Sequence, residues 1–296
     1  QFNLGLMFAN GVGVAPDYKQ ALLWYHRAAE RGVSAAQYIL ASKYANGQGV
    51  EQDFKQALAW YIKASDRGYP RATFRLGQLL SEPHEEFAED CYRQAAEKGL
   101  PEAQVVIADK LIAEQGSRNE GEAANPEQAL ALYQKAAESG AASAQYILGT
   151  YYECGKIGEG PDIQQALAWY RKSAKQGFAA AQTRLGQMYA QGEGVPKDNR
   201  QALTWFTRAA EQGNGDAQYQ LASMVEKGNG ADADPAQAEV WYIKAAEQGC
   251  APAQLRLAKL RETDSEEEAA YWYRQAAERG SPEGMLLLGG MYAEGR

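Results

Sequence analysis

The sequence predicts an all-α solenoid, a stack of about eight helix-turn-helix repeats of roughly 36 residues each. The motif Trp-Tyr-x-x-Ala-Ala-x-x-Gly, or a close variant, occurs eight times in the 296 residues. Its residues have the spacing of one helical face, and a helix-capping pattern stands before most copies. A chain with such a period is built from small units that bury their apolar faces only against neighbouring units. The glycines that close the motif are Gly32, Gly68, Gly99, Gly140, Gly177, Gly213, Gly249 and Gly280.

The first helix of each repeat follows this glycine. Its core face is exemplified by Gln37, Leu40 and Ala41. The place of Ala41 holds only Gly or Ala in every repeat, so we expect a larger side chain there to separate the two helices. Prolines stand near the start of this helix in four repeats, at Pro70, Pro101, Pro252 and Pro282.

The loop between the two helices has the form Gly-x-Gly in several repeats, as in Gly47-Gln48-Gly49. Three repeats vary, near residues 71–101, 102–142 and 252–282: the first and third lack the loop, and the second carries a polar insertion at 115–122. Loops of repeat arrays tolerate such changes because the helix packing is untouched. The loops follow a helix and lack a third glycine and a Walker lysine, which argues against a phosphate cradle.

The second helix carries the motif. In one repeat Ala57, Trp60, Tyr61 and Ala64 lie at i, i+3, i+4 and i+7, which is one face of a helix. We expect the tryptophans to be core residues, so that Trp60→Ala or Trp205→Ala costs roughly 3–5 kcal/mol. The six tryptophans hold the same place in their repeats and are Trp24, Trp60, Trp169, Trp205, Trp241 and Trp272.

The start of the second helix is marked by a capping residue, followed three residues later by Gln or Glu. This is the spacing of a capping box, in which each of the two side chains accepts from the backbone N–H of the other. In one repeat His84 holds this place, which predicts a degenerate cap. The motif glycines are the predicted C-caps. The predicted N-caps are Asp17, Asp53, Asn125, Asp162, Asp198, Asp234 and Ser265.

Composition and charge narrow the function classes. With 45% apolar and 23% charged residues the chain fits a folded protein. Its net charge of −8 argues against nucleic acid, because phosphate binding needs a basic surface. No apolar run approaches the roughly 18 residues of a membrane span.

Both ends of the sequence fall in the middle of a repeat. We therefore expect residues 1–296 to be a single repeat array cut from a longer chain. A signal peptide, a lipid anchor or a further domain would lie outside these residues, which leaves the compartment open.

No catalytic residue, cofactor or metal is predicted. The two histidines, His26 and His84, have no cysteine at zinc-ligand spacing. Cys91 and Cys250 occupy apolar places in the repeat and Cys154 a polar one, with no fixed spacing that would indicate a disulfide framework.

Three motifs together resemble the Sel1-like repeat family, a relative of the tetratricopeptide repeat. They are Ala-Gln-Tyr-x-Leu-Gly/Ala in the first helix, Gly-x-Gly-Val-x-x-Asp in the loop and Ala-Leu-x-Trp-Tyr-x-x-Ala-Ala-Glu-x-Gly in the second helix. The resemblance covers the whole chain and implies a right-handed superhelix whose first helices line the concave side. It also implies an adaptor or scaffold role and a bacterial source, with the cell envelope or periplasm favoured over the cytoplasm.

A ladder of aromatic residues on the first helices is the candidate partner-binding site. It occupies the place that faces the concave groove in related tetratricopeptide arrays, and polar residues stand four positions further on. Such a surface suits an extended peptide or a helix of a partner protein. The alternative is that the rings only pack against the next repeat. The candidate residues are Tyr38, Ser42, Phe74, Gln78, Asp109, Tyr146, Thr150, Gln187, Tyr219 and Ser223.

These observations favour a non-enzymatic scaffold that binds a protein or peptide partner in the groove. The alternatives are an assembly subunit of a bacterial envelope, secretion or polysaccharide complex, and, third, a hydrolase. The identity of the partner and the oligomeric state stay open.

Overall fold

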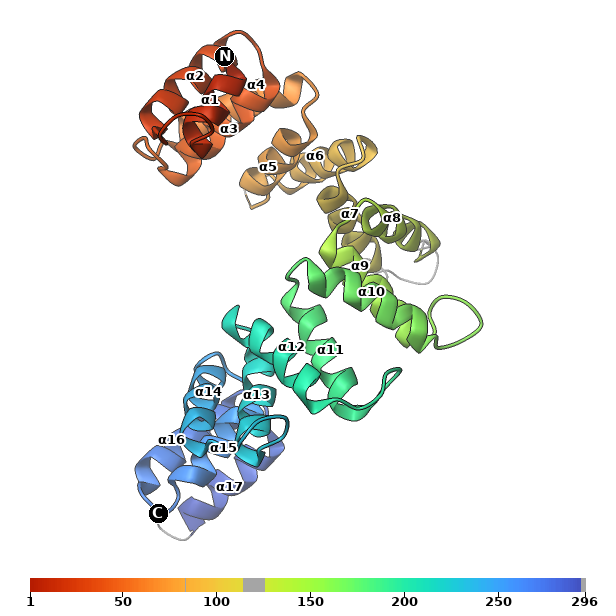
Figure 1. The fold of residues 1–296 in the computed structure, drawn as a ribbon, viewed down its shortest axis with the longest axis vertical. Helices are drawn as coiled ribbons and strands as arrows, with labels where there is room; N and C mark the ends of the chain where they lie inside the picture. Colours follow the sequence, from red (N-terminus) through yellow and green to blue (C-terminus); the bar gives the residue numbers. More distant parts are fainter. Residues whose placement is uncertain (83, 114–125, 294–296) are drawn as a thin grey trace. The chain divides into compact units, whose positions relative to one another are not determined.

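The computed structural model describes residues 1–82, 84–113 and 126–293. Over these residues the chain forms seventeen α-helices and no strands (Figure 1). They fall into two compact units, Gln1–Ala141 and Ala142–Arg296. The predicted all-α solenoid of repeated helix pairs is confirmed.

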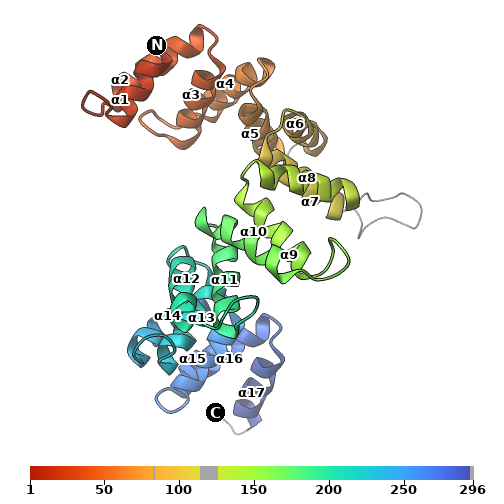
Figure 2. The same ribbon diagram turned by 45° about the vertical axis from the view of Figure 1, so that its right-hand side comes forward.

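In the first unit the helices pack in consecutive pairs, and the second helix of each pair also contacts the first helix of the next (Figures 1 and 2). The helices are α1 (Phe2–Asn10), α2 (Tyr18–Glu30), α3 (Ser34–Asn46), α4 (Phe54–Asp66), α5 (Pro70–Leu80), α6 (Glu85–Glu97), α7 (Pro101–Ala113) and α8 (Pro126–Glu138).

The second unit repeats this arrangement and ends on an unpaired first helix. Its helices are α9 (Ala142–Glu153), α10 (Ile163–Lys175), α11 (Ala179–Gln191), α12 (Asn199–Glu211), α13 (Gly215–Lys227), α14 (Pro235–Glu247), α15 (Ala251–Arg261), α16 (Glu266–Glu278) and α17 (Pro282–Ala293).

The two helices of a pair meet where an aromatic ring of the second helix lies against the small residue of the first. Tyr170 in α10 is fully buried, and a Cβ added to Gly149 in α9 would lie 2.5 Å from its ring. A Cβ added to Gly186 would likewise lie 2.6 Å from the ring of Phe206. This close approach leaves no room for a side chain at Gly149 or Gly186, and in repeats where Ala holds the place, as at Ala41, the residue is fully buried. Both findings fit the expectation that a side chain larger than Ala would separate the two helices.

The prediction for the tryptophans was wrong in part. Trp60 is buried, but the other five are only half-buried, and the Tyr or Phe that follows each of them is buried instead. A lysine or arginine three residues on covers most of these rings; the Lys63 ammonium, for example, lies 4.1 Å from the centre of the Trp60 ring. One residue along a helix turns the side chain by about 100°, so the tryptophan lies at the edge of the core stripe and the following ring at its centre.

The predicted N-caps are confirmed in the described repeats, but the capping box is only half formed. Asp53 accepts from the backbone N–H of Gln56, at 3.0 Å. Its own backbone N–H donates to the carbonyl of Tyr44 in α3, at 3.0 Å, and Gln56 is exposed. In a full capping box the backbone N–H of the N-cap residue would donate to the glutamine side chain. Here that N–H donates to a backbone carbonyl of the preceding helix instead. His84 makes no side-chain cap bond, as predicted.

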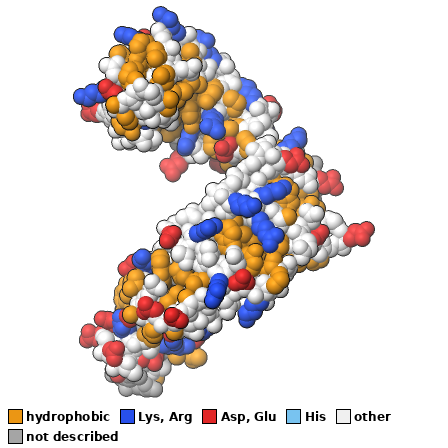
Figure 3. Space-filling model, viewed as in Figure 1, with side chains coloured by type: hydrophobic (Ala, Val, Ile, Leu, Met, Phe, Trp, Pro, Cys, Tyr) orange, Lys and Arg blue, Asp and Glu red, His pale blue; other side chains and the backbone are white. Residues whose placement is uncertain are grey.

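Two predictions, the cap Asn125 and the polar insertion at 115–122, lie outside the described residues. The C-cap prediction was wrong by one residue: the C-cap of α2 is Arg31, with φ −79°, and Gly32 follows it. The eight motif glycines all have positive φ, for example 86° at Gly32, so they end the helix from the position just after the cap. Apolar side chains also reach the surface among charged ones of both signs (Figure 3), as in most folded proteins.

Candidate partner-binding groove

The aromatic residues of the predicted ladder pack at a tilt against rings of the second helix of their own repeat. The Tyr38 ring centre lies 5.8 Å from that of Tyr61 and 5.4 Å from that of Tyr69, the N-cap of α5. Tyr146 makes the same pair of contacts, with Tyr170 at 5.6 Å and Phe178 at 5.5 Å. All of these ladder rings stay half-buried, so they contribute to packing between repeats and also keep one side open.

The other two ladder rings follow the same rule. Phe74 lies 5.4 Å from Tyr92, and Tyr219 lies 5.8 Å from Tyr242, measured between ring centres. Both are half-buried. These two contacts lie within one repeat, whereas those of Tyr38 with Tyr69 and of Tyr146 with Phe178 reach the next. Packing against the next repeat, the alternative weighed for the ladder, therefore accounts for part of the surface of Tyr38 and Tyr146.

Several of the polar candidate residues are bound to the buried tyrosine of their repeat. The Ser42 hydroxyl lies 3.1 Å from the Tyr61 hydroxyl, and Tyr133 donates to Asp109 at 2.5 Å. Ser223 likewise contacts the Tyr242 phenol. These contacts hold the second helix to the first and leave less of the polar side chain for a partner.

The other polar candidates take different partners. Gln78 accepts from the Arg75 guanidinium at 2.9 Å, and Gln187 accepts from Arg184 at 3.5 Å. The Thr150 hydroxyl donates to a carbonyl of its own helix at 2.7 Å. Gln78 and Asp109 are exposed, and the remaining polar candidates are half-buried.

A cavity of about 270 Å³ opens between α3, α5 and α7 in the first unit. It brings together three of the predicted residues, whereas Asp109 lies elsewhere in the unit. The arginines in its wall, at the start and middle of α5, are exposed and were not predicted. The lining residues are Tyr38, Arg71, Phe74, Arg75, Gln78, Leu100 and Glu102.

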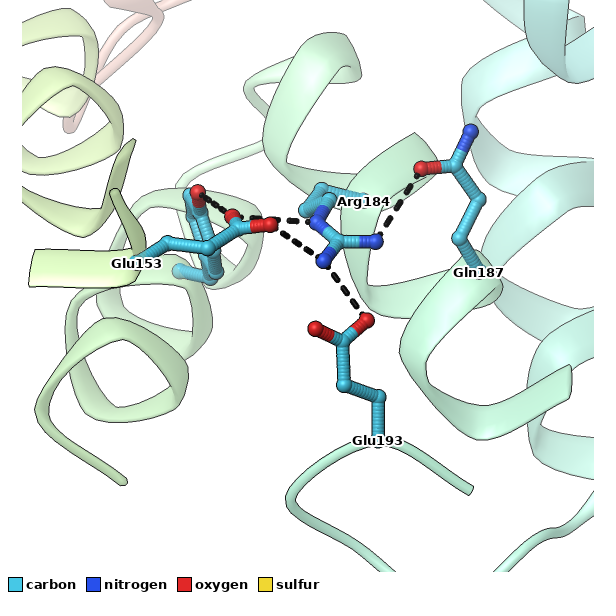
Figure 4. Close-up of polar contacts among 5 residues, drawn as sticks. Glu153, Arg184, Gln187 and Glu193 are labelled. Atoms are coloured by element: carbon cyan, nitrogen blue, oxygen red, sulfur yellow. Dashed lines mark hydrogen bonds and ion pairs between the residues drawn. The ribbon is translucent and has the colours of Figure 1, made fainter. Parts of the chain in front are cut away.

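In the second unit, polar contacts link consecutive first helices (Figure 4). Glu153 at the end of α9 accepts from the Arg184 Nε in α11 at 3.1 Å, and from the Tyr170 hydroxyl. Arg184 also binds Glu193, in the loop after α11, at 2.7 Å. Arg184 and Glu153 have only 17% and 23% of their side chains exposed, so water screens the pair little.

The network shifts the pKa of its members. Burial disfavours the charged form of Glu153, but hydrogen bonds from Arg184 and Tyr170 outweigh this and lower the pKa of the carboxyl. Burial and the hydrogen bond to Glu153 raise the pKa of Tyr170. The carboxylate and the guanidinium are therefore both charged at neutral pH.

The same arrangement recurs two repeats later. Glu226 in α13 accepts from the Tyr242 hydroxyl at 2.8 Å and forms an ion pair with Arg256 in α15. In both places the glutamate stands seven residues after a ladder tyrosine, and the arginine stands one residue after the ladder place of the next repeat. The sequence carried this signal, but it is invisible when each repeat is considered alone.

The part of the chain that the structure describes offers no metal site. These residues contain no cluster of three or more His, Cys, Asp or Glu side chains that could hold a metal ion. None of the helices within them has the length and hydropathy that a membrane crossing needs. Cys91 is buried, Cys250 half-buried and Cys154 exposed, in line with the places they hold in the repeat.

Comparison with family models gives one match. The model described as Sel1 repeat matches residues 1–33, 34–69, 70–100, 101–140, 142–178, 179–214, 215–250 and 251–281. No curated protein matches the chain.

Solved structures of bacterial proteins are similar to the chain. One is c5321, a protective antigen of uropathogenic Escherichia coli with an SLR fold, at 34% identity and a TM-score of 0.68. That match covers 99% of this chain but only 64% of c5321. A Sel1 repeat protein from Oxalobacter formigenes is 36% identical, with a TM-score of 0.63, over 88% of this chain and 75% of its own. The immunity protein PA5088 from Pseudomonas aeruginosa, at 20% identity and a TM-score of 0.52 over 70% of this chain and 81% of its own, shares the fold alone.

Proposed function

The chain belongs to the Sel1 repeat family, whose repeats mediate protein–protein interaction, and we propose that it is a non-enzymatic scaffold that binds a partner along its first helices. The cavity between α3, α5 and α7 carries this proposal. It places two aromatic rings, Tyr38 and Phe74, beside two exposed arginines, Arg71 and Arg75. Aromatic side chains and arginine are the residues that supply most binding energy at protein interfaces.

The remaining ladder residues extend the proposed surface within the second unit. Tyr146, Thr150, Gln187, Tyr219 and Ser223 occupy equivalent places on α9, α11 and α13. Each unit then offers its own stretch of first helices to a partner, and an elongated partner would contact several repeats in turn.

Photo-crosslinking tests the proposed function. A benzophenone amino acid at Gln78, which is exposed in the cavity wall, should crosslink a discrete partner in an extract of the source organism. The same group at Gln56, exposed at the start of α4, is the matched control and should not. Excess unlabelled wild-type protein should compete for the crosslink, and a Phe74→Ala variant should compete poorly. Equal crosslinking from both positions would contradict the proposal.

A second candidate is an assembly subunit of a bacterial envelope complex. The similarity to c5321, described as a protective antigen, favours it because a protective antigen is seen by the host. Fractionation of the full-length protein distinguishes the two settings: recovery with the envelope would favour this second candidate.

A further inference from the structure

Repeats of the chain can be compared place by place at one arginine position. Arg75, Arg184 and Arg256 each stand one residue after the ladder place of their first helix. Arg184 and Arg256 receive a carboxylate from the end of the preceding first helix, Glu153 and Glu226 respectively. For Arg75 the equivalent place holds Ala45, which has no carboxylate.

Arg75 is therefore left without the ion pair that its two counterparts make. It is exposed, donates to Gln78 and makes no ion pair with any residue that the structure describes. Arg71, one turn earlier on α5, is exposed in the same cavity wall and is likewise without an ion pair among the described side chains. Glu102, at the start of α7, is the one acid in that wall.

The surroundings of Arg75 suit a carboxylate that arrives from outside. The cavity has about 270 Å³ of space, which two aromatic rings and a leucine bound on its apolar side. Its two arginines outnumber its single acid, although the chain as a whole has a net charge of −8. Guanidinium groups bind carboxylates with two parallel hydrogen bonds, and such charged bonds are stronger than neutral ones.

We propose that this cavity binds the side-chain carboxylate of a Glu or Asp within an acidic segment of a partner protein. The carboxylate takes the place on Arg75 that Glu153 takes on Arg184, and Arg71 provides a second cationic contact. An apolar residue next to it in the segment packs between Tyr38 and Phe74. The inference rests on the proposed scaffold function and names the chemistry of the partner.

One variant tests, within the chain itself, whether Arg75 lacks a carboxylate partner. Ala45→Glu places a carboxylate where Glu153 and Glu226 stand, beside Arg75 and the Tyr61 hydroxyl, and should raise the melting temperature. Ala190→Glu is the matched control, because Ala190 holds the same place in α11, but the buried ring of that repeat is Phe206, which has no hydroxyl, and the next repeat has Gln220 in place of the arginine. This control should not raise the melting temperature, and an equal effect of both variants would overturn the assignment.

The second test uses peptides as probes. A phage-displayed library of random dodecapeptides is selected on the wild-type protein, and the selected peptides are synthesised with acetylated and amidated ends. We expect Glu or Asp next to an apolar residue, and about tenfold weaker binding when that acid becomes Gln or Asn. Binding to Arg75→Gln and to Ala45→Glu should weaken by a similar factor. Ala190→Glu should bind as wild type, and so should Arg200→Gln, which removes an exposed arginine from the second helix α12. Glu102→Gln should bind more tightly, because it removes a like charge.

Each contrary result has a defined meaning. The carboxylate site is wrong if no peptide is selected, if the amide versions bind equally, or if a free terminal carboxylate is needed. It is also wrong if Arg75→Gln binds normally while circular dichroism shows it folded. If the Gln78 crosslink nevertheless persists in Arg75→Gln, the scaffold function stands and only the acidic chemistry is lost.

Discussion

Glu153 on α9 and Arg184 on α11 form an ion pair that joins two consecutive first helices, and the Glu153 carboxylate also accepts a hydrogen bond from the hydroxyl of buried Tyr170. Glu153 therefore stabilises the packing of one repeat on the next, through Arg184, and the packing of the two helices within its own repeat, through Tyr170. Replacing Glu153 with Gln removes the charge but keeps the shape. We expect a loss of about 1.5–3 kcal/mol in the free energy of unfolding, as for hydrogen bonds to charged groups, measured by urea denaturation at pH 7.

This loss should depend on pH. The pKa of Glu153 is lowered in the folded chain from an ordinary value of 4.5, so its contribution is complete above 4.5 and disappears as the pH falls through the lowered value. The difference between wild type and Glu153→Gln should thus be constant from neutral pH to about pH 5 and shrink below pH 4.5. A difference that stays constant into strong acid would contradict the lowered pKa.

Gly149 should tolerate no side chain. A Cβ there would lie 2.5 Å from the Tyr170 ring, so Gly149→Ala is expected to cost about 1–3 kcal/mol through overpacking. Gly289 in α17 holds the same place, but nothing lies within 4 Å of its Cβ direction. Gly289→Ala should therefore stabilise by up to about 1 kcal/mol, since Ala is the better helix former. Thermal unfolding of the two variants measures the contrast, and a matching sign would refute the packing argument.

Adjacent residues of α10 should differ in their energetic weight. Tyr170 is fully buried, whereas Trp169 is half-buried with the Lys172 ammonium 3.8 Å from its ring centre. We expect Tyr170→Ala to cost about 3–5 kcal/mol and Trp169→Ala only about 1–2 kcal/mol, although tryptophan is the larger residue. Chemical denaturation of both variants decides the order.

The cap of α12 separates the two halves of the predicted capping box. Asp198→Ala removes an acceptor for two backbone N–H groups, at 2.9 and 3.0 Å, and should cost about 0.5–2 kcal/mol. The backbone N–H of Asp198 is bound to the carbonyl of Tyr189 instead of to Gln201, which is exposed. Gln201→Ala should therefore change the free energy of unfolding by less than about 0.5 kcal/mol. A large effect at Gln201 would restore the full box.

The fold could be predicted from the sequence because the same local signals recur in every repeat. Helical spacing, caps such as Asp198 and positive-φ glycines such as Gly32 act within a few residues, and the period supplies the packing order. These signals do not predict that Tyr170 is more buried than Trp169. Both residues lie on the apolar side of the helix, and the turn of about 100° between them decides which one lies at the centre of the core.

The candidate site was harder to predict for a physical reason. Its ladder residues are set by the repeat, and Tyr38 and Phe74 do share a cavity wall. The charged contacts that distinguish one repeat from another join residues about 30 positions apart, as Glu226 joins Arg256. They depend on how two repeats stack, which the pattern inside one repeat does not contain.

A second carboxylate site can also be created at Arg256, where a glutamate of the chain itself occupies the equivalent place. Glu226→Ala would leave Arg256 without its ion pair beside the Tyr242 hydroxyl, as Ala45 leaves Arg75 beside that of Tyr61. Tyr219 and Leu255 then stand in the places of Tyr38 and Phe74, so an acidic peptide selected on the wild-type protein should find a second site. Titration calorimetry should show one bound peptide on the wild type and two on Glu226→Ala, with Arg256→Gln in the same background restoring one. An unchanged stoichiometry in a folded variant would mean that an unpaired arginine at this place is not enough to capture a carboxylate, and the Arg75 cavity would then need its second arginine, Arg71, to bind one.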